Sequence, residues 1–172
     1  DGRILAVVIH SDGPQQVGVF DLADGSLTKL TDEAADHWNP ALSPDGNSVV
    51  CHKRAAGETI PNVERWGTPP GTGLDLIRIA GAFPAFSPDE SRMALTGGGF
   101  GRIDVMHVDG SNRNTIFEGE RRSLFGISWS RAPQRVAFSH GVVFGEASAR
   151  VNIMMAAPDG EELVALTSDA GN

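Results

Sequence analysis

The sequence predicts an all-β protein built from repeated units, and three observations carry this prediction. The 172 residues include 21 glycines and 10 prolines, which separate short apolar runs as turns separate strands. One motif recurs at spacings of 44 and 43 residues. Most copies are followed by further strand-sized runs and an Asp-Gly turn signal. Because a period of about 40–45 residues with four strands per unit is typical of β-propellers, we expect a propeller of four-stranded blades.

The repeated motif is clearest at residues 39–50 (NPALSPDGNSVV) and 83–94 (FPAFSPDESRMA), which align without gaps. A third copy at 126–137 (GISWSRAPQRVA) keeps the aromatic-Ser pair and the apolar run after it, but lacks the Pro-Asp-Gly turn. Residues 1–6 (DGRILA) match the second half of the motif. We therefore expect one partial propeller domain over residues 1–172. Its four blades are expected at approximately residues 1–36, 37–80, 81–124 and 125–172.

Each unit also divides into strands beyond the motif. The apolar run after the motif turn predicts a second strand, at 3–11, 48–54, 92–97 and 135–140. A third strand is predicted before each Asp-Gly pair, at 16–22, 103–108 and 151–156, and a fourth at 27–31, 114–117 and 162–167. Residues 54–74 of the second unit are interpreted as a long insertion with an irregular third strand, followed by a fourth strand at 75–79.

The residue types in the turns predict the backbone conformation at several glycines. Asp-Gly between alternating strands favours a type I′ turn, because both residues tolerate positive φ. Gly46 is expected to have positive φ in the turn between the first two strands of its unit. The corresponding residue of the next unit is Glu90, so a different turn is expected there.

The aromatic-Ser-Pro-Asp-Gly segments resemble the WD40-like (PD40) repeats of the TolB propeller family, in three clear copies and one truncated copy. The resemblance implies a ring of about six to eight blades in which the first strand of each blade lines a central channel. It also implies a role as a partner in envelope or secreted assemblies, and hence a secreted or periplasmic location. Similar repeats occur in the propellers that gate prolyl-oligopeptidase-like serine peptidases.

The first unit lacks its innermost strand, and the last ends where another innermost strand is expected to begin. An unpaired strand edge favours association with further chain. We therefore expect an arc of a larger propeller, completed by further sequence or by a second copy in a homodimer.

Composition argues against several classes of function. The net charge is −8, with 22 acidic against 14 basic residues, and the only basic cluster is Arg121-Arg122, so nucleic acid is not an expected partner. Cys51 is the single cysteine, which excludes an internal disulfide and a cysteine-based metal site. No apolar run approaches the roughly 18 residues of a membrane span. No calcium-type acidic loop is present, so no metal or cofactor is expected.

Two segments come close to catalytic or phosphate-binding motifs. Residues 126–130 (GISWS) approach the Gly-x-Ser-x-Gly nucleophile elbow, but that elbow leads into a helix, whereas the repeat places Ser128 inside a strand. Residues 97–101 (GGGFG) precede a predicted strand, whereas a phosphate-binding loop opens a helix. A catalytic channel would need acids or histidines on several inner strands, which here are mostly Pro, Ala, Leu, Phe and Ile. The chain is therefore not expected to be an enzyme.

Three histidines, His10, His52 and His140, fall near the end of the second strand in three different units. Equivalent positions of several blades converge on one face, so these imidazoles could together bind a metal or an anionic group. The alternative is that each of them only caps the end of a strand.

Two aromatic-polar clusters are candidates for ligand binding: His37, Trp38 and Asn39 at the start of an inner strand, and Glu64, Arg65 and Trp66 in the insertion. Both belong to one unit, so we expect a single patch with an apolar centre and a charged rim. The alternatives are that Trp38 packs between blades and that the insertion folds over the flank. The sequence thus predicts non-catalytic binding of a protein, a peptide or a small polar or sugar ligand at the channel face. The alternative is the gating propeller of a serine peptidase.

Overall fold

The computed structural model describes residues 2–70, 77–97, 99–119, 124–141 and 151–168, which form fifteen strands and no helix. The first sheet contains β1 (Ile4–Ile9), β2 (Gln16–Asp21) and β3 (Leu27–Lys29). The second contains β4 (Ala35–Leu42), β5 (Ser48–Ala55), β6 (Asn62–Gly67) and β7 (Arg78–Ala80). The third contains β8 (Ala82–Phe86), β9 (Arg92–Gly97), β10 (Arg102–His107) and β11 (Asn114–Glu118). The fourth contains β12 (Leu124–Trp129), β13 (Val136–Gly141), β14 (Val151–Ala156) and β15 (Val164–Ala165).

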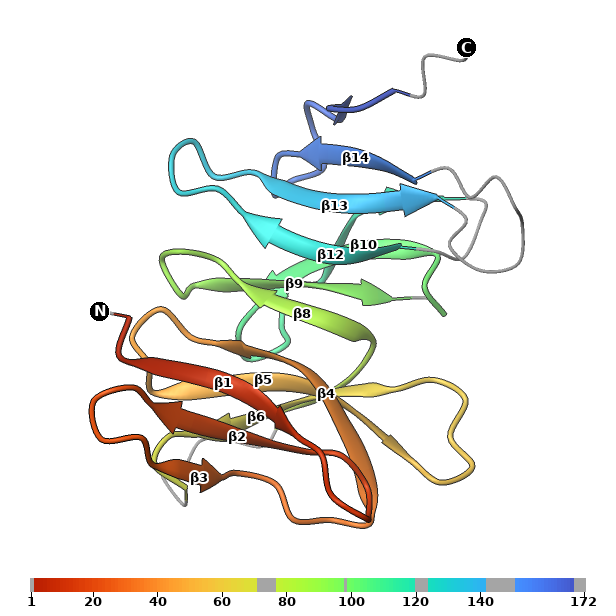
Figure 1. Cartoon of the computed structure of the whole chain (residues 1–172). Helices are drawn as coiled ribbons and strands as arrows, with labels where there is room; N and C mark the ends of the chain where they lie inside the picture. Colours follow the sequence, from red (N-terminus) through yellow and green to blue (C-terminus); the bar gives the residue numbers. More distant parts are fainter. Residues whose placement is uncertain (1, 71–76, 98, 120–123, 142–150, 169–172) are drawn as a thin grey trace.

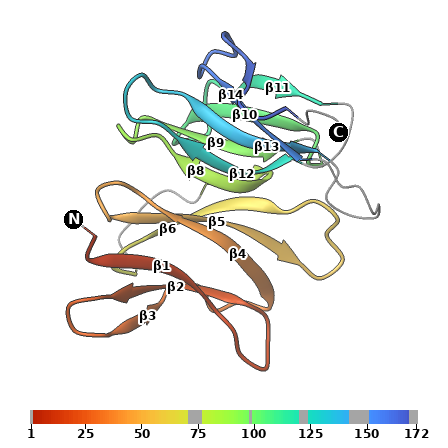
Figure 2. The ribbon, with the colours of Figure 1, turned by 45° about the horizontal axis from the view of Figure 1, so that its top comes forward.

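Each sheet is an antiparallel meander in which every strand pairs with the next one in the sequence. The four sheets stack face to face in sequence order (Figure 1), and the turned view shows that neighbouring sheets are not parallel but diverge from one another (Figure 2). The first strand of the second, third and fourth sheets lies at one edge of its sheet, and β8 contacts both β4 and β12. These three inner strands therefore form one continuous side of the molecule.

Strand alternation buries both faces of the second sheet. Val49 and Cys51 of β5 face the first sheet and pack with Val17 and Leu30, whereas Val50, between them, packs into the core shared with the third sheet. Successive side chains of a strand point to opposite faces, so an unbroken apolar run is what a sheet between two others needs. A third core, between the third and fourth sheets, contains Phe138.

Neighbouring sheets are joined by a backbone hydrogen bond that repeats at each interface. The amide of His37 donates to Gln15 O, that of Gly81 to Pro61 O and that of Leu124 to Phe100 O, at 2.9, 2.9 and 3.2 Å. The three donors are spaced like the sequence motif, and each lies at or just before the start of an inner strand. Each acceptor lies in a hairpin loop of the preceding sheet: Gln15 between β1 and β2, Pro61 between β5 and β6, and Phe100 between β9 and β10.

The turn after each inner strand has the same construction in three sheets. The hydroxyl oxygens of Ser43, Ser87 and Ser130 accept the amides of the residues five positions later, at 2.9, 3.0 and 2.9 Å. Gly46 has φ +78°, which confirms the prediction. The prediction of a different turn at Glu90 is wrong: Glu90 has φ +60° and donates its amide to Ser87 O, as Gly46 donates to Ser43 O. The serine and aspartate of the motif hold this turn without glycine.

This equivalence predicts opposite responses at two matched positions. Gly46→Val should lower the free energy of unfolding by about 1–3 kcal/mol, because a β-branched residue is strained at positive φ. Glu90→Gly should cost nothing, or add up to about 1 kcal/mol, because it relieves the same strain. Urea unfolding of both variants tests this. A loss of stability in Glu90→Gly equal to that in Gly46→Val would contradict it.

The Asp-Gly hairpins also differ from the expected type I′ turns. Gly110 and Gly160 have φ +85° and +94°, whereas Asp109 and Asp159 do not have positive φ. The amide of Gly110 donates to His107 O, so a type I turn is followed by one left-handed glycine. The aspartate instead accepts the amide two residues later, as Asp109 does from Ser111 at 2.8 Å.

The interpretation of residues 54–74 as a long insertion is wrong. Residues 62–67 form the regular strand β6, which pairs with both β5 and β7, and only residues 56–61 form the hairpin loop. The fourth strand is Arg78–Ala80; residues 75 and 76 of the predicted strand lie outside the described residues. The alternation of buried and exposed residues in these strands is not visible in the sequence, because the face toward the first sheet carries the polar residues Asn62, Glu64 and Arg78. A sequence pattern identifies a buried face only by its apolar side chains.

Candidate functional site

The inner strands of three sheets enclose a depression of about 560 Å³ near their carboxyl ends. Equivalent positions of the repeat line it, since Leu42, Phe86 and Trp129 occupy the same place in three sheets, as do Ala41, Ala85 and Ser128. The remaining lining residues are Pro44, Pro88, Ile127 and Arg131.

Trp129 is held at this site by two contacts with the third sheet. Its Nε1 donates to Ala85 O at 3.1 Å, and the Arg92 guanidinium lies 5.9 Å from the ring centroid. Arg131 is exposed at the rim and supplies the one charge among the described lining residues. The site thus combines apolar side chains with one cation, which suits an apolar side chain next to a negative group.

A bulge precedes the depression in each of the three strands. Asn39, Phe83 and Gly126 have φ values of +46°, +51° and +65°, and the ladder to the next strand shifts register at each of these positions. Bulges redirect the strand locally. The repeat therefore turns the carboxyl ends of the three strands in the same way.

A row of rings crosses the other end of the inner strands. The Trp38 and His52 ring centroids are 5.2 Å apart, His52 and Phe83 are 5.5 Å apart, and Phe83 and Phe125 are 6.4 Å apart. The Arg54 guanidinium lies 5.0 Å from the Trp38 centroid. Burial, together with the nearby Arg54 charge, lowers the pKa of His52 to about 4, so its imidazole is neutral at pH 7.

Of the first predicted cluster, His37 lies beside Glu64 and Trp66 of the second, but Trp38 does not, so the two clusters do not form one patch. Trp38 pairs with His52 across the β4–β5 ladder, whereas Trp66 pairs with Val49 across the β5–β6 ladder. His52 and Val49 point to opposite faces of β5, so Trp38 faces the third sheet and Trp66 faces the first. The expectation of a single patch is wrong because Glu64–Trp66 belong to a strand and not to a loop.

The predicted residues differ widely in exposure. Asn39 is exposed, and its Nδ2 lies 3.3 Å from His52 Nδ1. His37 and Glu64 are buried, with 0% and 1% of their surface exposed. Arg65 is half-buried and donates from Nε to Ser48 Oγ at 3.2 Å, so it stabilises its own sheet.

The proposed convergence of three histidines is also wrong. His10 is exposed just after β1, His52 is buried among rings, and His140 packs on the Phe117 ring at 5.0 Å. Among the described residues, the one group placed to hold a metal is instead Glu33, His37 and Glu64.

Leu42, Phe86 and Trp129 were not predicted as site residues. They belong to the repeated motif itself, whose apolar residues predict strands and not a binding site. The signal was nevertheless present, since equivalent positions of successive blades converge on one axis.

A second depression of about 680 Å³ lies between the first two sheets, on the side of the motif turns. Asp21, Asp45 and Thr68 are among its lining residues. It is formed at a single interface, whereas three blades contribute equivalent residues to the smaller depression, which is therefore the better candidate for a binding site.

No protein-family model matches the sequence, and no curated protein matches it. Among solved structures, a protein assigned as TolB from Agrobacterium tumefaciens superimposes with a TM-score of 0.75 at 17% identity, over 97% of this chain and 62% of that one. The chain has the β-propeller fold. TolB from Acinetobacter baumannii superimposes at 0.71 and 18% identity, over 99% of this chain and 42% of that one.

A structure from a study of two prolyl endopeptidases also superimposes, with a TM-score of 0.68 and 14% identity, over 98% of this chain and 28% of that one. The propeller therefore spans less than two thirds of each of these three proteins. Its four sheets are four blades of an open ring, and the blade formed by β1–β3 has three strands.

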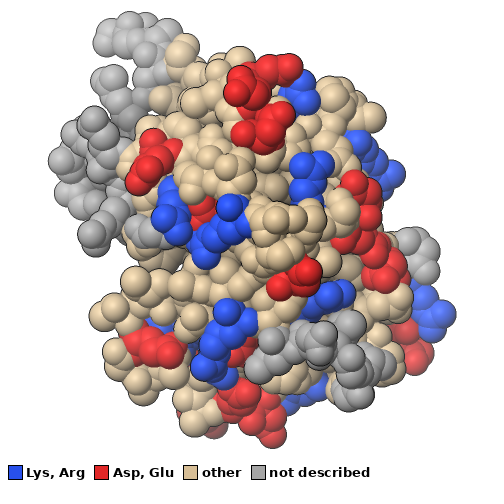
Figure 3. Space-filling model, turned by 180° about the vertical axis from the view of Figure 1, so that it is seen from behind, with Lys and Arg blue, Asp and Glu red and all other residues tan. Residues whose placement is uncertain are grey.

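Charges of both signs intermingle over the face of the propeller seen from behind in Figure 3. Arg121 and Arg122 lie outside the described residues. In the described part of the chain, no helix has the length and apolar character needed to cross a membrane.

Proposed function

We propose that this propeller is a non-catalytic binding module that takes a protein or peptide ligand on the channel side of its inner strands. The observation that carries the proposal is the depression to which three blades contribute equivalent residues, with Phe86 and Trp129 in its wall and Arg131 at its rim. Aromatic residues and arginine are enriched among the residues that dominate binding energy.

The chemistry of the lining supports binding over catalysis. Among the residues that the structure describes, the lining contains no histidine, aspartate or glutamate that could serve Ser128 as a general base. Ser128 pairs with Ala137 in the β12–β13 ladder and not in a strand-to-helix elbow.

The peptide ligand follows from the same lining. The exposed guanidinium of Arg131 favours a carboxylate, which it can bind in a bidentate manner. The wall formed by Leu42, Phe86 and Trp129 favours an apolar side chain beside it. A carboxyl-terminal peptide that ends in an apolar residue combines both groups.

A gating propeller of a serine peptidase is the second candidate, supported by the superposition on a prolyl endopeptidase structure. The two candidates differ in one measurable property. A binding module retains its ligand at a saturable site, whereas a gate needs only to let a peptide pass.

Immobilised peptides with free apolar carboxyl termini, compared with the same peptides amidated, test the proposal. We expect saturable binding of the free-carboxylate forms. Trp129→Ala and Arg131→Gln should each weaken it by roughly 1–3 kcal/mol. Trp38→Ala and Arg54→Gln are the matched controls, because they alter the same residue types away from the depression, where Arg54 of β5 lies on the Trp38 ring. Absence of binding, or equal binding by all four variants, would refute the proposal.

A further inference from the structure

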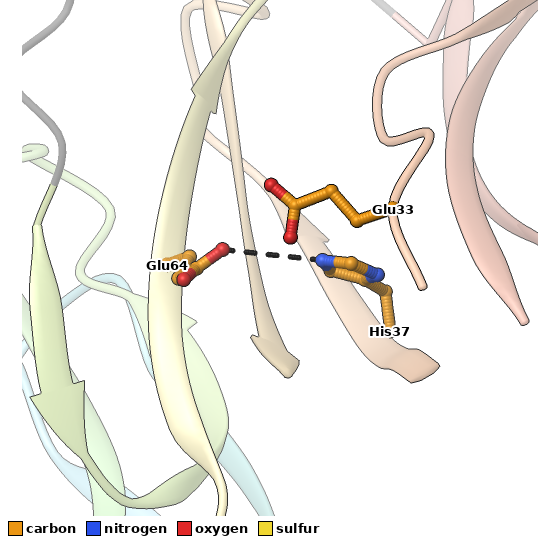
Figure 4. Close-up of side chains that lie close together, drawn as sticks. All are labelled: Glu33, His37 and Glu64. Atoms are coloured by element: carbon orange, nitrogen blue, oxygen red, sulfur yellow. Dashed lines mark ion pairs between the residues drawn. The ribbon is translucent and has the colours of Figure 1, made fainter. Parts of the chain in front are cut away.

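A buried polar cluster lies between the first two blades, on the face of the second blade that the first one covers. His37 comes from β4, Glu64 from β6, and Glu33 from the segment that precedes β4 (Figure 4). The side chains converge, and one ligand atom from each lies within 4.8 Å of the others. Lys53 contacts both carboxylates, and Arg78 donates to Glu64 Oε1 at 3.2 Å.

Two atoms at the centre of this cluster have no hydrogen-bond partner. His37 Nε2 and Glu64 Oε2 are both buried without a hydrogen-bond partner, and they face each other at 3.9 Å, a contact that is an ion pair only if His37 is protonated. An unsatisfied polar atom in the interior costs about 1–3 kcal/mol, so such a pair calls for a group that would satisfy both atoms.

The other ring nitrogen of His37 indicates what that group is. His37 Nδ1 lies 3.1 Å from Ala35 O and donates to it, so Nε2 is the ring nitrogen directed toward Glu64. Histidines that bind metals nearly always donate their second ring N–H to a carbonyl or carboxylate in this way. A neutral imidazole held in this tautomer turns its Nε2 lone pair toward the Glu64 carboxylate, a repulsion that either a proton on Nε2 or a bound cation relieves.

The equivalent position in the third blade provides an internal comparison. Leu95 and Cys51 occupy the same place in the repeat, because they are 44 residues apart. Asp104 lies opposite Leu95 in the third sheet, and Glu64 lies opposite Cys51 in the second, so Asp104 is the counterpart of Glu64. Asp104 is fully buried, but both of its oxygens are occupied, Oδ2 by Arg113 at 2.6 Å and Oδ1 by Thr115 at 2.6 Å. Both oxygens of the buried acid are therefore satisfied by the chain in the third blade, whereas in the second blade Glu64 Oε2 has no hydrogen-bond partner.

We propose that Glu33, His37 and Glu64 form a binding site for a divalent transition metal, best matched by Zn²⁺. One imidazole nitrogen and two carboxylate oxygens are ligands that Zn²⁺ accepts, whereas Ca²⁺ and Mg²⁺ prefer oxygen alone. Ligand atoms around tetrahedral Zn²⁺ lie about 3.4 Å apart, so the three groups must close by roughly 1 Å. Glu33 can make that movement, since its side chain is 40% exposed and lies outside the strands.

Lys53 is the competitor of the metal. Its ammonium contacts Glu33 and lies 3.4 Å from Glu64 Oε1, so it neutralises the carboxylates when no metal is bound. Binding of a divalent ion displaces this ammonium from Glu33. A neutral side chain of similar length at position 53 should therefore strengthen metal binding.

The test is a titration of untagged, chelator-treated protein with Zn²⁺, Co²⁺ and Ca²⁺. Calorimetry measures the binding, and the midpoint temperature of thermal unfolding is measured with and without each ion. We expect one site for Zn²⁺ and Co²⁺, a raised midpoint and no response to Ca²⁺. Trp66, whose ring centroid is 6.2 Å from that of His37, should report Co²⁺ by quenching. Lys53→Met should bind at least about tenfold more tightly. His37→Gln should bind about 100-fold less tightly. Removal of a residue that only supports a ligand already costs about 10–100-fold in metal affinity, and His37 is proposed as a ligand itself.

His10→Gln is the matched control, because it removes an exposed histidine remote from the cluster. If His37→Gln fails to fold, Glu33→Gln replaces it, since that carboxylate lies outside the core. The site is refuted if neither wild type nor Lys53→Met binds Zn²⁺. It is also refuted if binding survives the loss of His37 or Glu33, or is matched by Ca²⁺.

Discussion

Phe138→Ala should lower the free energy of unfolding by about 3–5 kcal/mol, which is the usual cost of removing a large buried ring. Phe138 is 1% exposed and lies in the core between the third and fourth blades, with its ring centroid 5.0 Å from that of Phe117. Neighbouring strands hold the backbone on both sides, so the cavity has little room to collapse. Urea unfolding followed by circular dichroism measures the loss.

Phe125→Ala is the matched control for this prediction. Phe125 belongs to the same blade but is half-buried on the inner strand, so its truncation leaves no closed cavity. We expect a loss well below that of Phe138→Ala. Equal losses in the two variants would show that the interface between the third and fourth blades does not contribute a tightly packed core.

The second large effect is a loss of stability between pH 6.5 and about 4, caused by His52. Burial lowers the pKa of this imidazole from 6.5 to about 4, so the unfolded chain binds a proton in this range that the folded protein excludes. The stabilisation by neutral His52 is therefore complete above about pH 6.5 and is lost progressively as the pH falls to about 4. The loss approaches about 3 kcal/mol, as the pKa difference requires.

Unfolding experiments at closely spaced pH values measure this effect. His52→Gln should flatten the profile between pH 6.5 and about 4. The pKa values of Asp45 and Asp89 are held low by hydrogen bonds from Ser43 and Ser87. Their contribution is lost only at lower pH, below about 4. A wild-type profile that is flat down to pH 4.5 would contradict the role of His52.

The propeller fold was predictable because its signals are local and repeated. The motif at residues 39–50 and 83–94 fixes the inner strand, the serine-held turn and the second strand, and its spacing fixes the number of blades. The positive φ of Gly46 followed from the same pattern. At Glu90, by contrast, side-chain hydrogen bonds outweigh the backbone preference, which composition alone does not reveal.

The candidate site was less predictable because it depends on which face each residue occupies. Glu64 and Trp66 resemble surface residues in the sequence, but β6 directs them toward the first blade. His37 is buried next to the exposed segment that carries Glu33. The depression at Trp129 arises only when three blades converge, a relation between residues more than 40 positions apart.

Each of the repeated hydrogen bonds at the blade interfaces joins one blade to the next, so each blade interacts directly with its neighbours alone. The His37, Gly81 and Leu124 amides are protected by the preceding blade and not by the sheet to which each belongs or leads. The rate at which these three amides exchange with solvent deuterium therefore reports how often an interface between blades opens. The exchange rate of the amides within β5 or β9 reports instead how often a whole sheet opens. Disturbance at one interface reaches a distant blade only through the blades between them, so cooperativity decays along the arc.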